Sequence, residues 1–335
     1  MKYLLLSIIA VLFSSTVISQ TDEKRLDEIF SKTYRNYIIS QGDNLPDFDS
    51  RKDNTDRFLV SLSYGIAPDY FMKKAGWTSG KYESRVRFLI EKGWVKKTGD
   101  KLTPTVFIVS EEKGELLYKY AKPVSEAIAA SIEKDLPYIL QKYQNAGFDK
   151  KYSFGDLSFL ILSDVLLDNW QIMNMEAAFL KQENRPERHG KFYYASIEEN
   201  SGDGYEPFKI YGNQSGRIND SIWINIYGNN RIEANTRLAD IRFRDSVAVS
   251  CLHLKPSNYN YFDEIAAEFR PALVKILEDN RDYSMKVYRK TGYSEQIRFE
   301  EFFIWWYHFI YTETTNILAG KKIIKKPASG NFFYL

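Results

Sequence analysis

The sequence is poor in the residues that build disulfides and metal centres. Its 335 residues include one cysteine, Cys251, and three histidines that lie far apart. A lone cysteine cannot close a disulfide within the chain, and its apolar surroundings predict a buried position on a strand. Because there are no Cys pairs and the three histidines are widely spread, we expect no structural metal. The sequence also contains no Gly-rich phosphate loop and no Gly-x-Ser-x-Gly elbow, so no cofactor is expected.

The chain also lacks an excess of charge of either sign. It carries 46 Lys and Arg residues against 44 Asp and Glu residues, for a formal net charge of +2. No global field therefore attracts nucleic acid or acidic lipid. After the N-terminal segment no apolar run is long enough to span a membrane, because residues 157–167 are interrupted by Ser158, Ser163 and Asp164.

The N-terminal segment has the three parts of a secretory signal. Lys2 precedes an apolar and small-residue run from Tyr3 to Val17, and small side chains stand at Val17 and Ser19. This pattern predicts cleavage after Ser19 and a periplasmic or secreted protein. The alternative is an uncleaved anchor, and only in that case is the membrane an expected partner.

Residues 57–110 predict three short helices and a hairpin. Helical spacing is found at about 58–64, 68–74 and 81–92, and Gly93 is a candidate left-handed cap. Two short strands, from Trp94 to Lys97 and from Leu102 to Val109, flank the turn Thr98-Gly99-Asp100. A preceding amphipathic helix is predicted from Leu26 to Ile38.

This order resembles the winged helix-turn-helix superfamily, with a weaker echo in a helix plus hairpin at residues 299–335. The resemblance implies a third helix and a wing that contact DNA or a protein partner. Cations suited to such contacts follow one another here: Lys81, Arg85, Arg87, Lys96, Lys97 and Lys101. The export signal and three interspersed acids make protein, rather than nucleic acid, the expected partner.

The remainder of the chain predicts long helices and one short sheet. Helices are expected at residues 111–133 and 136–144, which are split by Pro137, and at 154–181, 261–279 and 299–318. Alternating strands are expected at 192–197, 208–211, 222–227 and 238–254, as one largely antiparallel sheet. The predicted class is α+β, with a signal at 1–19, a winged-helix-like helical region at 20–150 and a mixed region at 151–335.

Two sets of side chains are candidates for chemistry or for ligand binding. Asp164 and Asp168 share a face of an apolar helix, and His189 lies on a charged turn; together they predict an acid-base site. The simpler interpretation of the aspartates is a polar stripe that faces solvent or pairs with an arginine. Arg242 and Arg244 alternate with apolar residues and are candidates for an anionic or sugar-like ligand.

Three hypotheses about function therefore remain. The first is a non-enzymatic binding or interaction module of the bacterial envelope, with a protein or a small polar ligand as its partner. The second is an enzyme that uses Asp164, Asp168 and His189. The third is a membrane-tethered DNA-binding regulator, which requires that the N-terminal segment is retained.

Overall fold

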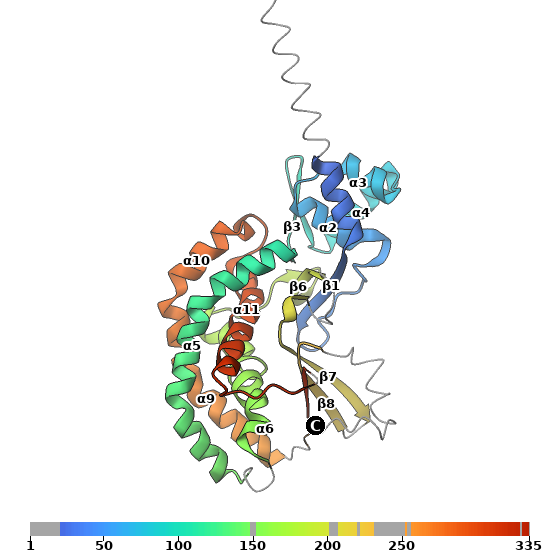
Figure 1. Cartoon of the computed structure of the whole chain (residues 1–335). Coiled ribbons are helices and arrows are strands. Elements are labelled where there is room, and N and C mark those ends of the chain that lie inside the picture. The colour runs from blue at the N-terminus through green and yellow to red at the C-terminus, as the bar shows by residue number, and fades with distance from the viewer. Residues whose placement is uncertain are drawn as a thin grey trace, which may run out of the picture. The chain divides into compact units, whose positions relative to one another are not determined.

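The computed structural model shows a mixed α/β protein (Figure 1). It describes residues 21–147, 152–200, 207–219, 222–230, 252, 256–328 and 330–334. The chain divides into two compact units. Unit 1 comprises Met1–Ser110, Asn184–Ser201 and Glu295–Ile297, and unit 2 comprises Glu111–Glu183, Gly202–Ser294 and Arg298–Leu335. The boundary predicted at residue 150 lies inside unit 2.

Some sequence predictions fall on residues outside the described ranges. These are the signal segment 1–19, the single cysteine Cys251, and the candidate ligand residues Arg242 and Arg244. Within the described residues, no helix combines the length and the apolar character needed to cross a membrane.

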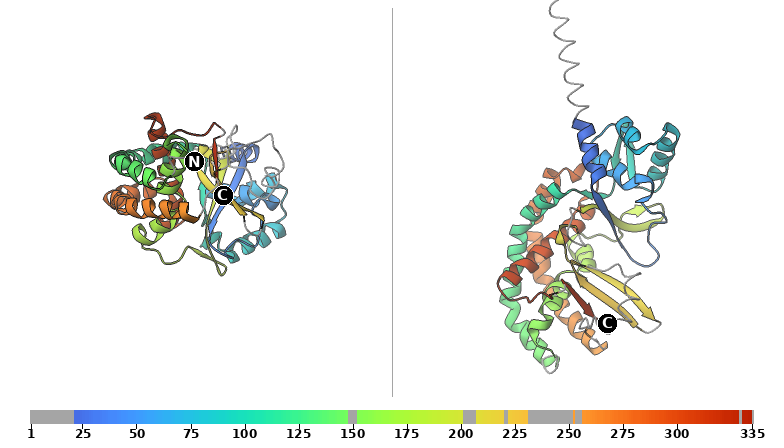
Figure 2. Two further views of the ribbon diagram at one scale, coloured as in Figure 1. Left: turned by 90° about the horizontal axis from the view of Figure 1, so that it is seen from below. Right: turned by 45° about the vertical axis from the view of Figure 1, so that its right-hand side comes forward.

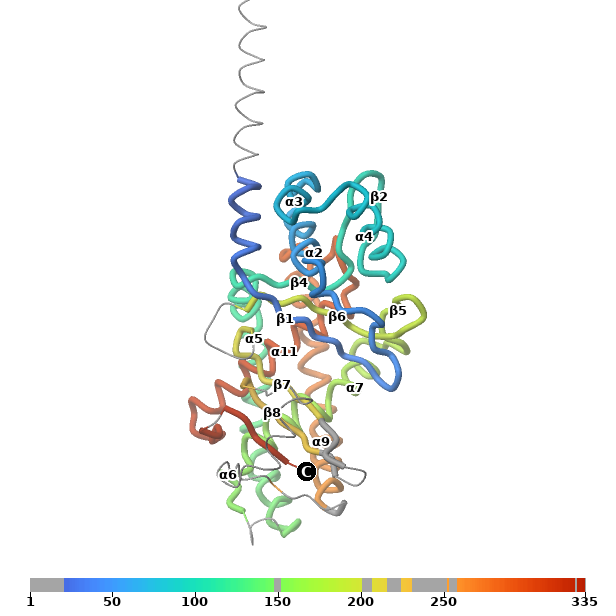
Figure 3. The backbone as a smooth tube through the Cα atoms, turned by 90° about the vertical axis from the view of Figure 1, so that its right-hand side faces the viewer, coloured from blue at the N-terminus to red at the C-terminus, as the bar shows by residue number. Residues whose placement is uncertain are grey.

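A small sheet forms one layer of unit 1 (Figure 3). Strand β1 (Thr33–Ser40) pairs antiparallel with β6 (Lys191–Asn200), and β4 (Phe107–Val109) pairs parallel with the same strand. Strand β5 (Glu187–Arg188) forms a short hairpin with β6. The helix predicted to run to Ile38 is therefore wrong beyond residue 31, where the helical residues 21–31 end. Aromatic and β-branched side chains such as Tyr37 and Ile38 fit a strand as well as a helix, and the pairing with β6 decides between them.

The three short helices of unit 1 are confirmed as elements, and the hairpin is confirmed in part: the second strand, predicted over 102–109, ends at Pro104, and residues 107–109 form β4, which pairs with β6 instead. The helices and hairpin strands are α2 (Thr55–Ser63), α3 (Pro68–Ala75), α4 (Ser79–Glu91), β2 (Val95–Thr98) and β3 (Lys101–Pro104). Pro68 occupies the first turn of α3, and Gly76 ends that helix with a φ of 65°. The Thr78 hydroxyl caps α4 by accepting from the Lys81 amide. A short 3-10 turn, η1 (Lys52–Asn54), precedes α2.

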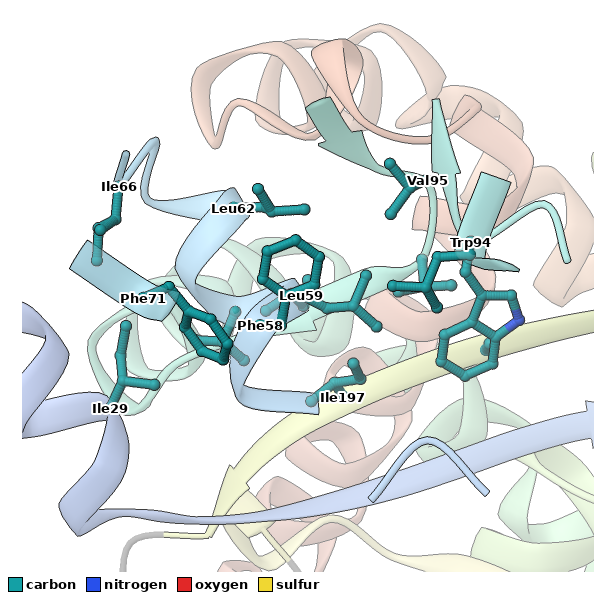
Figure 4. Close-up of a cluster of buried hydrophobic side chains, with 14 of the residues drawn as sticks. Ile29, Phe58, Leu59, Leu62, Ile66, Phe71, Trp94, Val95 and Ile197 are labelled. Atoms are coloured by element: carbon teal, nitrogen blue, oxygen red, sulfur yellow. The ribbon is translucent and has the colours of Figure 1, made fainter. Parts of the chain in front are cut away.

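The core of unit 1 is aromatic and joins the helices to the sheet (Figure 4). Phe58 of α2 lies 5.1 Å from Phe71 and 5.3 Å from Trp77 between ring centroids. The Trp94 indole N–H donates to the Tyr193 hydroxyl at 2.8 Å, so the hairpin is tied to β6 by a buried hydrogen bond. This core therefore requires residues from both ends of unit 1 in the sequence.

Long helices dominate unit 2 (Figures 1 and 2). They are α5 (Glu111–Asn145), α9 (Pro256–Asp279), α10 (Arg281–Lys290) and α11 (Phe299–Gly320). Ser125 donates to the Ile310 carbonyl at 2.8 Å, and the Trp306 indole donates to the Leu117 carbonyl at 3.1 Å, which fixes α11 against α5. The break predicted at Pro137 is wrong, because α5 continues through it.

The segment predicted as one helix over 154–181 is instead a series of short ones. They are α6 (Phe154–Phe159), η3 (Leu160–Val165), α7 (Ile172–Asn174) and η4 (Met175–Phe179). Both η3 and η4 are π-helical, a conformation that is rare and usually confined to single turns. Because a π-helical turn is wider than an α-helical turn, successive side chains of η3 and η4 do not stay on a single α-helical face.

The sheet of unit 2 contains β7 (Gly212–Asn219), β8 (Ile222–Gly228) and the C-terminal strand β9 (Asn331–Tyr334), all antiparallel. The prediction of one sheet with four strands is wrong. Its first strand, β6, belongs to unit 1, and residues 207–209 form the 3-10 turn η5 (Pro207–Lys209). Of the strand predicted at 238–254, only Leu252 is described, and it forms a bridge with Tyr334.

The hairpin predicted at the C-terminus is also wrong. Residues 321–326 form no strand, and β9 pairs with β8 instead. A further 3-10 turn, η6 (Tyr293–Glu295), precedes α11. The local sequence pattern does not indicate which distant strand β9 pairs with.

Gly114 on α5 provides a test of the packing in unit 2. A Cβ at this position would overlap the ring of Phe208, which is held by a hydrogen bond from the Tyr118 hydroxyl to its carbonyl at 2.8 Å. We expect Gly114→Ala to lower the free energy of unfolding by about 1–3 kcal/mol through overpacking. Gly80→Ala on α4 is the control, since nothing lies within 4 Å of the added Cβ, and it should cause no loss. Equal stability of the two variants in denaturant unfolding would contradict the packing described.

Candidate functional site

Asp164 and Asp168 are both buried in unit 2. Asp164 lies in η3 with an exposed fraction of 0%, and Asp168 follows one turn later with 5%. The Asp168 amide donates to the Asp164 carbonyl at 3.0 Å. The solvent-facing stripe predicted for these residues is therefore wrong. Residues 157–168 are all buried, so this segment has no exposed face, and Asn169 is the first exposed residue after it.

The Asp164 carboxylate accepts hydrogen bonds from two strands of the small sheet. Asn213 of β7 donates from Nδ2 to both carboxylate oxygens at 3.0 Å. The Tyr334 hydroxyl of β9 donates to Oδ2 at 2.7 Å, and Asn213 Nδ2 also donates to that hydroxyl at 2.9 Å. We call Asp164, Asn213 and Tyr334 the carboxylate cluster. It fastens η3 to both outer strands of the sheet.

Burial controls the electrostatics of the carboxylate cluster. It raises the pKa of Asp164 to about 7, against the opposing effect of the hydrogen bonds from Tyr334 and Asn213. It also raises the pKa of Tyr227 and of Tyr334, and the negative charges of Asp168 and Asp164 add to the increase at Tyr227. Within the described part of the chain, the carboxylate of Asp164 contacts neutral donors and no cation.

Hydroxyl groups fill the space beside this cluster. Ser163 pairs with the Tyr227 hydroxyl and, at 2.6 Å, with the Thr315 hydroxyl of α11. Tyr307 of the same helix donates to the Leu167 carbonyl at 2.8 Å, and Tyr311 donates to the Tyr211 carbonyl at 2.6 Å. These bonds satisfy buried polar groups and fix the position of η3 and the sheet against α11.

The arrangement is better suited to holding structure than to acid-base catalysis. A carboxyl group with a pKa near 7 has the right strength for proton transfer at neutral pH. Catalysis also requires contact with substrate, whereas the Asp164 side chain is itself fully buried behind the half-buried Asn213. Among the described residues, no group of three His, Cys, Asp or Glu side chains is placed to hold a metal ion.

His189 belongs to unit 1, whereas both aspartates belong to unit 2. It occupies the turn between β5 and β6 with a positive φ of 52°, and its Nε2 lies 3.8 Å from a Glu91 carboxylate oxygen. Its side chain is 48% exposed. Glu91 at the end of α4 and Asp47 are thus acidic groups near His189.

Four of the six candidate cations on unit 1 have partners on the same unit. Lys81 and Arg85 both pair with Asp53, at 3.1 Å and 2.8 Å. Lys96 donates to the Glu295 carbonyl at 2.7 Å, and Lys101 lies 3.6 Å from the Glu295 carboxylate.

The other two, Arg87 and Lys97, are exposed and form no ion pair with the described residues. Lys97 lies on β2 and Arg87 on the outer face of α4. These two side chains are therefore the cations best placed to meet a partner.

Helix α4 has a wide exposed face. Of its 13 residues only Leu89 is fully buried, and Ile90 is 40% exposed. Arg87 lies one turn before Ile90 on the same face. We call Arg87, Ile90 and Lys97, with the hairpin β2–β3 that carries Lys97, the α4 surface.

Comparison of the chain with protein-family models, curated proteins and solved structures gives no match.

Sequence reasoning identified Asp164 but missed its donors. Asn213 and Tyr334 lie 49 and 170 positions away, and neither belongs to a recognisable motif. The single available signal was the need of any buried carboxylate for donors, which does not say where they come from.

The Tyr334 hydroxyl provides a direct test of the carboxylate cluster. Tyr334→Phe removes one donor from a buried carboxylate, so we expect the free energy of unfolding to fall by about 1–3 kcal/mol. Tyr64→Phe is the control, because that ring is 37% exposed, and its effect should stay within about 0.5 kcal/mol. Denaturant titration measures both variants. An unchanged midpoint for Tyr334→Phe would show that the bond does not stabilise the fold.

Proposed function

We propose that this protein is an exported binding module that contacts a protein partner through the α4 surface. The observation that carries the proposal is the exposure of α4, a helix that buries only Leu89 and leaves Ile90 40% exposed beside Arg87. We further propose that α2, α3, α4 and the hairpin β2–β3 act together as a winged-helix-like unit. Winged-helix units bind proteins as well as DNA.

The chemistry of the α4 surface supports a protein partner. Interfaces place a few apolar or aromatic anchors and Arg side chains at the centre, and surround them with charged groups of both signs. Ile90 and Arg87 provide such a centre. Lys97 and the exposed acids Glu83 and Glu91 provide a mixed rim.

DNA binding is less well supported than protein binding. Affinity for DNA grows with the number of phosphates that cations neutralise, so a strong patch needs many unengaged cations. Asp53 and Glu295 engage four of the six candidates within unit 1. Exposed ion pairs are weak, so DNA phosphates would compete with the acids for these cations. The acids nevertheless remain beside the cations and reduce the local positive potential.

The enzyme hypothesis has the least support. Its acid-base pair, Asp164 and Asp168, is buried with 0% and 5% exposure, and the Asp164 carboxylate is already saturated by donors. A small-ligand function at Arg242 and Arg244 rests on the sequence pattern alone.

Export is the second part of the proposal. Its support is the signal-like segment 1–19, with a basic start, an apolar core and small residues at Val17 and Ser19. Transfer out of the cytoplasm removes the chain from genomic DNA and favours a partner in the envelope or the medium.

Site-specific photo-crosslinking in the producing cell tests the α4 surface. A photoreactive residue at Ile90 should yield one discrete protein adduct, whereas the same residue at Met173 in unit 2, which is 60% exposed, should not. Arg87→Glu should reduce the Ile90 adduct at least tenfold, because the substitution reverses a central charge. The matched charge reversal Lys73→Glu on α3, where the side chain is 83% exposed, should leave the adduct unchanged.

Two outcomes would contradict this proposal. Equal adducts at Ile90 and Met173 would indicate non-specific collision. Salt-sensitive binding of the purified protein to duplex DNA, abolished by Arg87→Glu or Lys97→Glu, would favour the regulator instead.

Cell fractionation with N-terminal sequencing tests export. The mature chain should begin at Gln20 and appear in the periplasm or the medium. Recovery of an intact Met1 in the membrane fraction would exclude cleavage and restore the tethered-regulator hypothesis. A Ser19→Lys variant, which removes the small residue before the cut, should accumulate as the uncleaved precursor.

A further inference from the structure

One contact of the C-terminal strand is unusual, because it joins a buried tyrosine to a buried carboxylate. β9 has four residues and is the last strand in the order β7-β8-β9. Its backbone pairs with β8, and the Leu252 amide donates to the Phe333 carbonyl at 2.9 Å. At its end, Tyr334 is fully buried and donates to the buried carboxylate of Asp164 at 2.7 Å.

The surroundings of Asp164 disfavour its charge. On β7 and β9 the carboxylate meets the neutral donors Asn213 and Tyr334, and on its own segment it meets the Asn169 amide. Tyr227 of β8 and Tyr259 of α9 are near enough for its charge to raise their pKa values. The remaining titratable group described here is the carboxyl of Asp168, which also acts on Tyr227 and Tyr307.

Among the described residues no cation acts on this carboxyl group, and burial opposes its ionisation while β9 is docked. Release of β9 would remove the Tyr334 side chain from Asp164 and admit water. The ionised Asp164 carboxylate would then regain the hydration that it lacks while β9 is docked.

We propose that β9 is a pH-sensitive closing strand, docked firmly while Asp164 is protonated and released more readily when Asp164 is ionised. This inference is independent of the α4 surface, since it concerns unit 2 alone. It assigns Asp164 a conformational role in place of the catalytic role expected from the sequence.

The direction of the pH effect follows from the linkage between protonation of Asp164 and docking of β9. In the docked state burial raises the pKa of Asp164 to about 7, while in water it would return towards the ordinary value of 3.8. Between these two pH values docking takes up a proton, so the docking equilibrium weakens by up to about tenfold for each pH unit. Below that window both states are protonated and above it both are ionised, so the equilibrium becomes flat at each end.

Hydrogen exchange of the β9 amides tests the proposal with the full chain. After correction for the intrinsic pH dependence of exchange, protection of Phe332, Phe333 and Tyr334 should fall on the order of 100-fold from about pH 4.5 to about pH 7.5. Asp164→Asn should abolish this dependence, because the amide does not titrate. Tyr311→Phe is the matched control: its hydroxyl bonds the Tyr211 carbonyl in the same unit, and the variant should keep the full dependence.

Tyr334→Phe is a second variant that keeps the proposal testable if Asp164→Asn does not fold. It should lower β9 protection at every pH and extend the fall to higher pH, because a donor that favours the ionised carboxylate is lost. Protection equal to that of the wild type would overturn the proposal. So would a pH dependence retained in Asp164→Asn, or one shared equally by the amides of α11, which would indicate global unfolding.

Discussion

The burial of one carboxylate organises unit 2. Asp164 lies in the most apolar part of the chain, and a buried carboxyl group is tolerated only where donors reach it. Asn213 and Tyr334 supply those donors from the two outer strands of a small sheet. These hydrogen bonds attach the sheet to η3, independently of the contacts between the helices. The π-helical turns of η3 are consistent with this requirement, since they change the direction in which Asp164 projects.

Elements with strong local signals were predicted correctly. Pro68, Gly76 and Gly93 mark the ends of helices in unit 1, and the turn at Gly99 separates two strands, so the three helices and the hairpin followed from neighbouring residues alone. The same holds for β8 and α11, whose hydrophobic periods are unbroken.

Features that depend on distant pairing were not predictable in the same way. Tyr37 and Ile38 satisfy a helical period, and only the presence of β6 makes them a strand. Asp164 and Asp168 were identified by their spacing, yet their exposure was misjudged, because the strands that cover them come from far along the chain. Pro137 was overrated as a helix breaker, since the tertiary contacts of a 35-residue helix outweigh one missing hydrogen bond.

The position of β6 has a consequence for biosynthesis. β1 and β4 do not pair with each other, and both are joined only through β6, which the ribosome makes after α5 and the η3–η4 segment. The first 110 residues therefore leave the ribosome without the central strand of their own sheet. Tyr193, the hydrogen-bond partner of Trp94, arrives with that strand. Unit 1 therefore stays incomplete until β6 has been made, a delay that would suit the export proposed above.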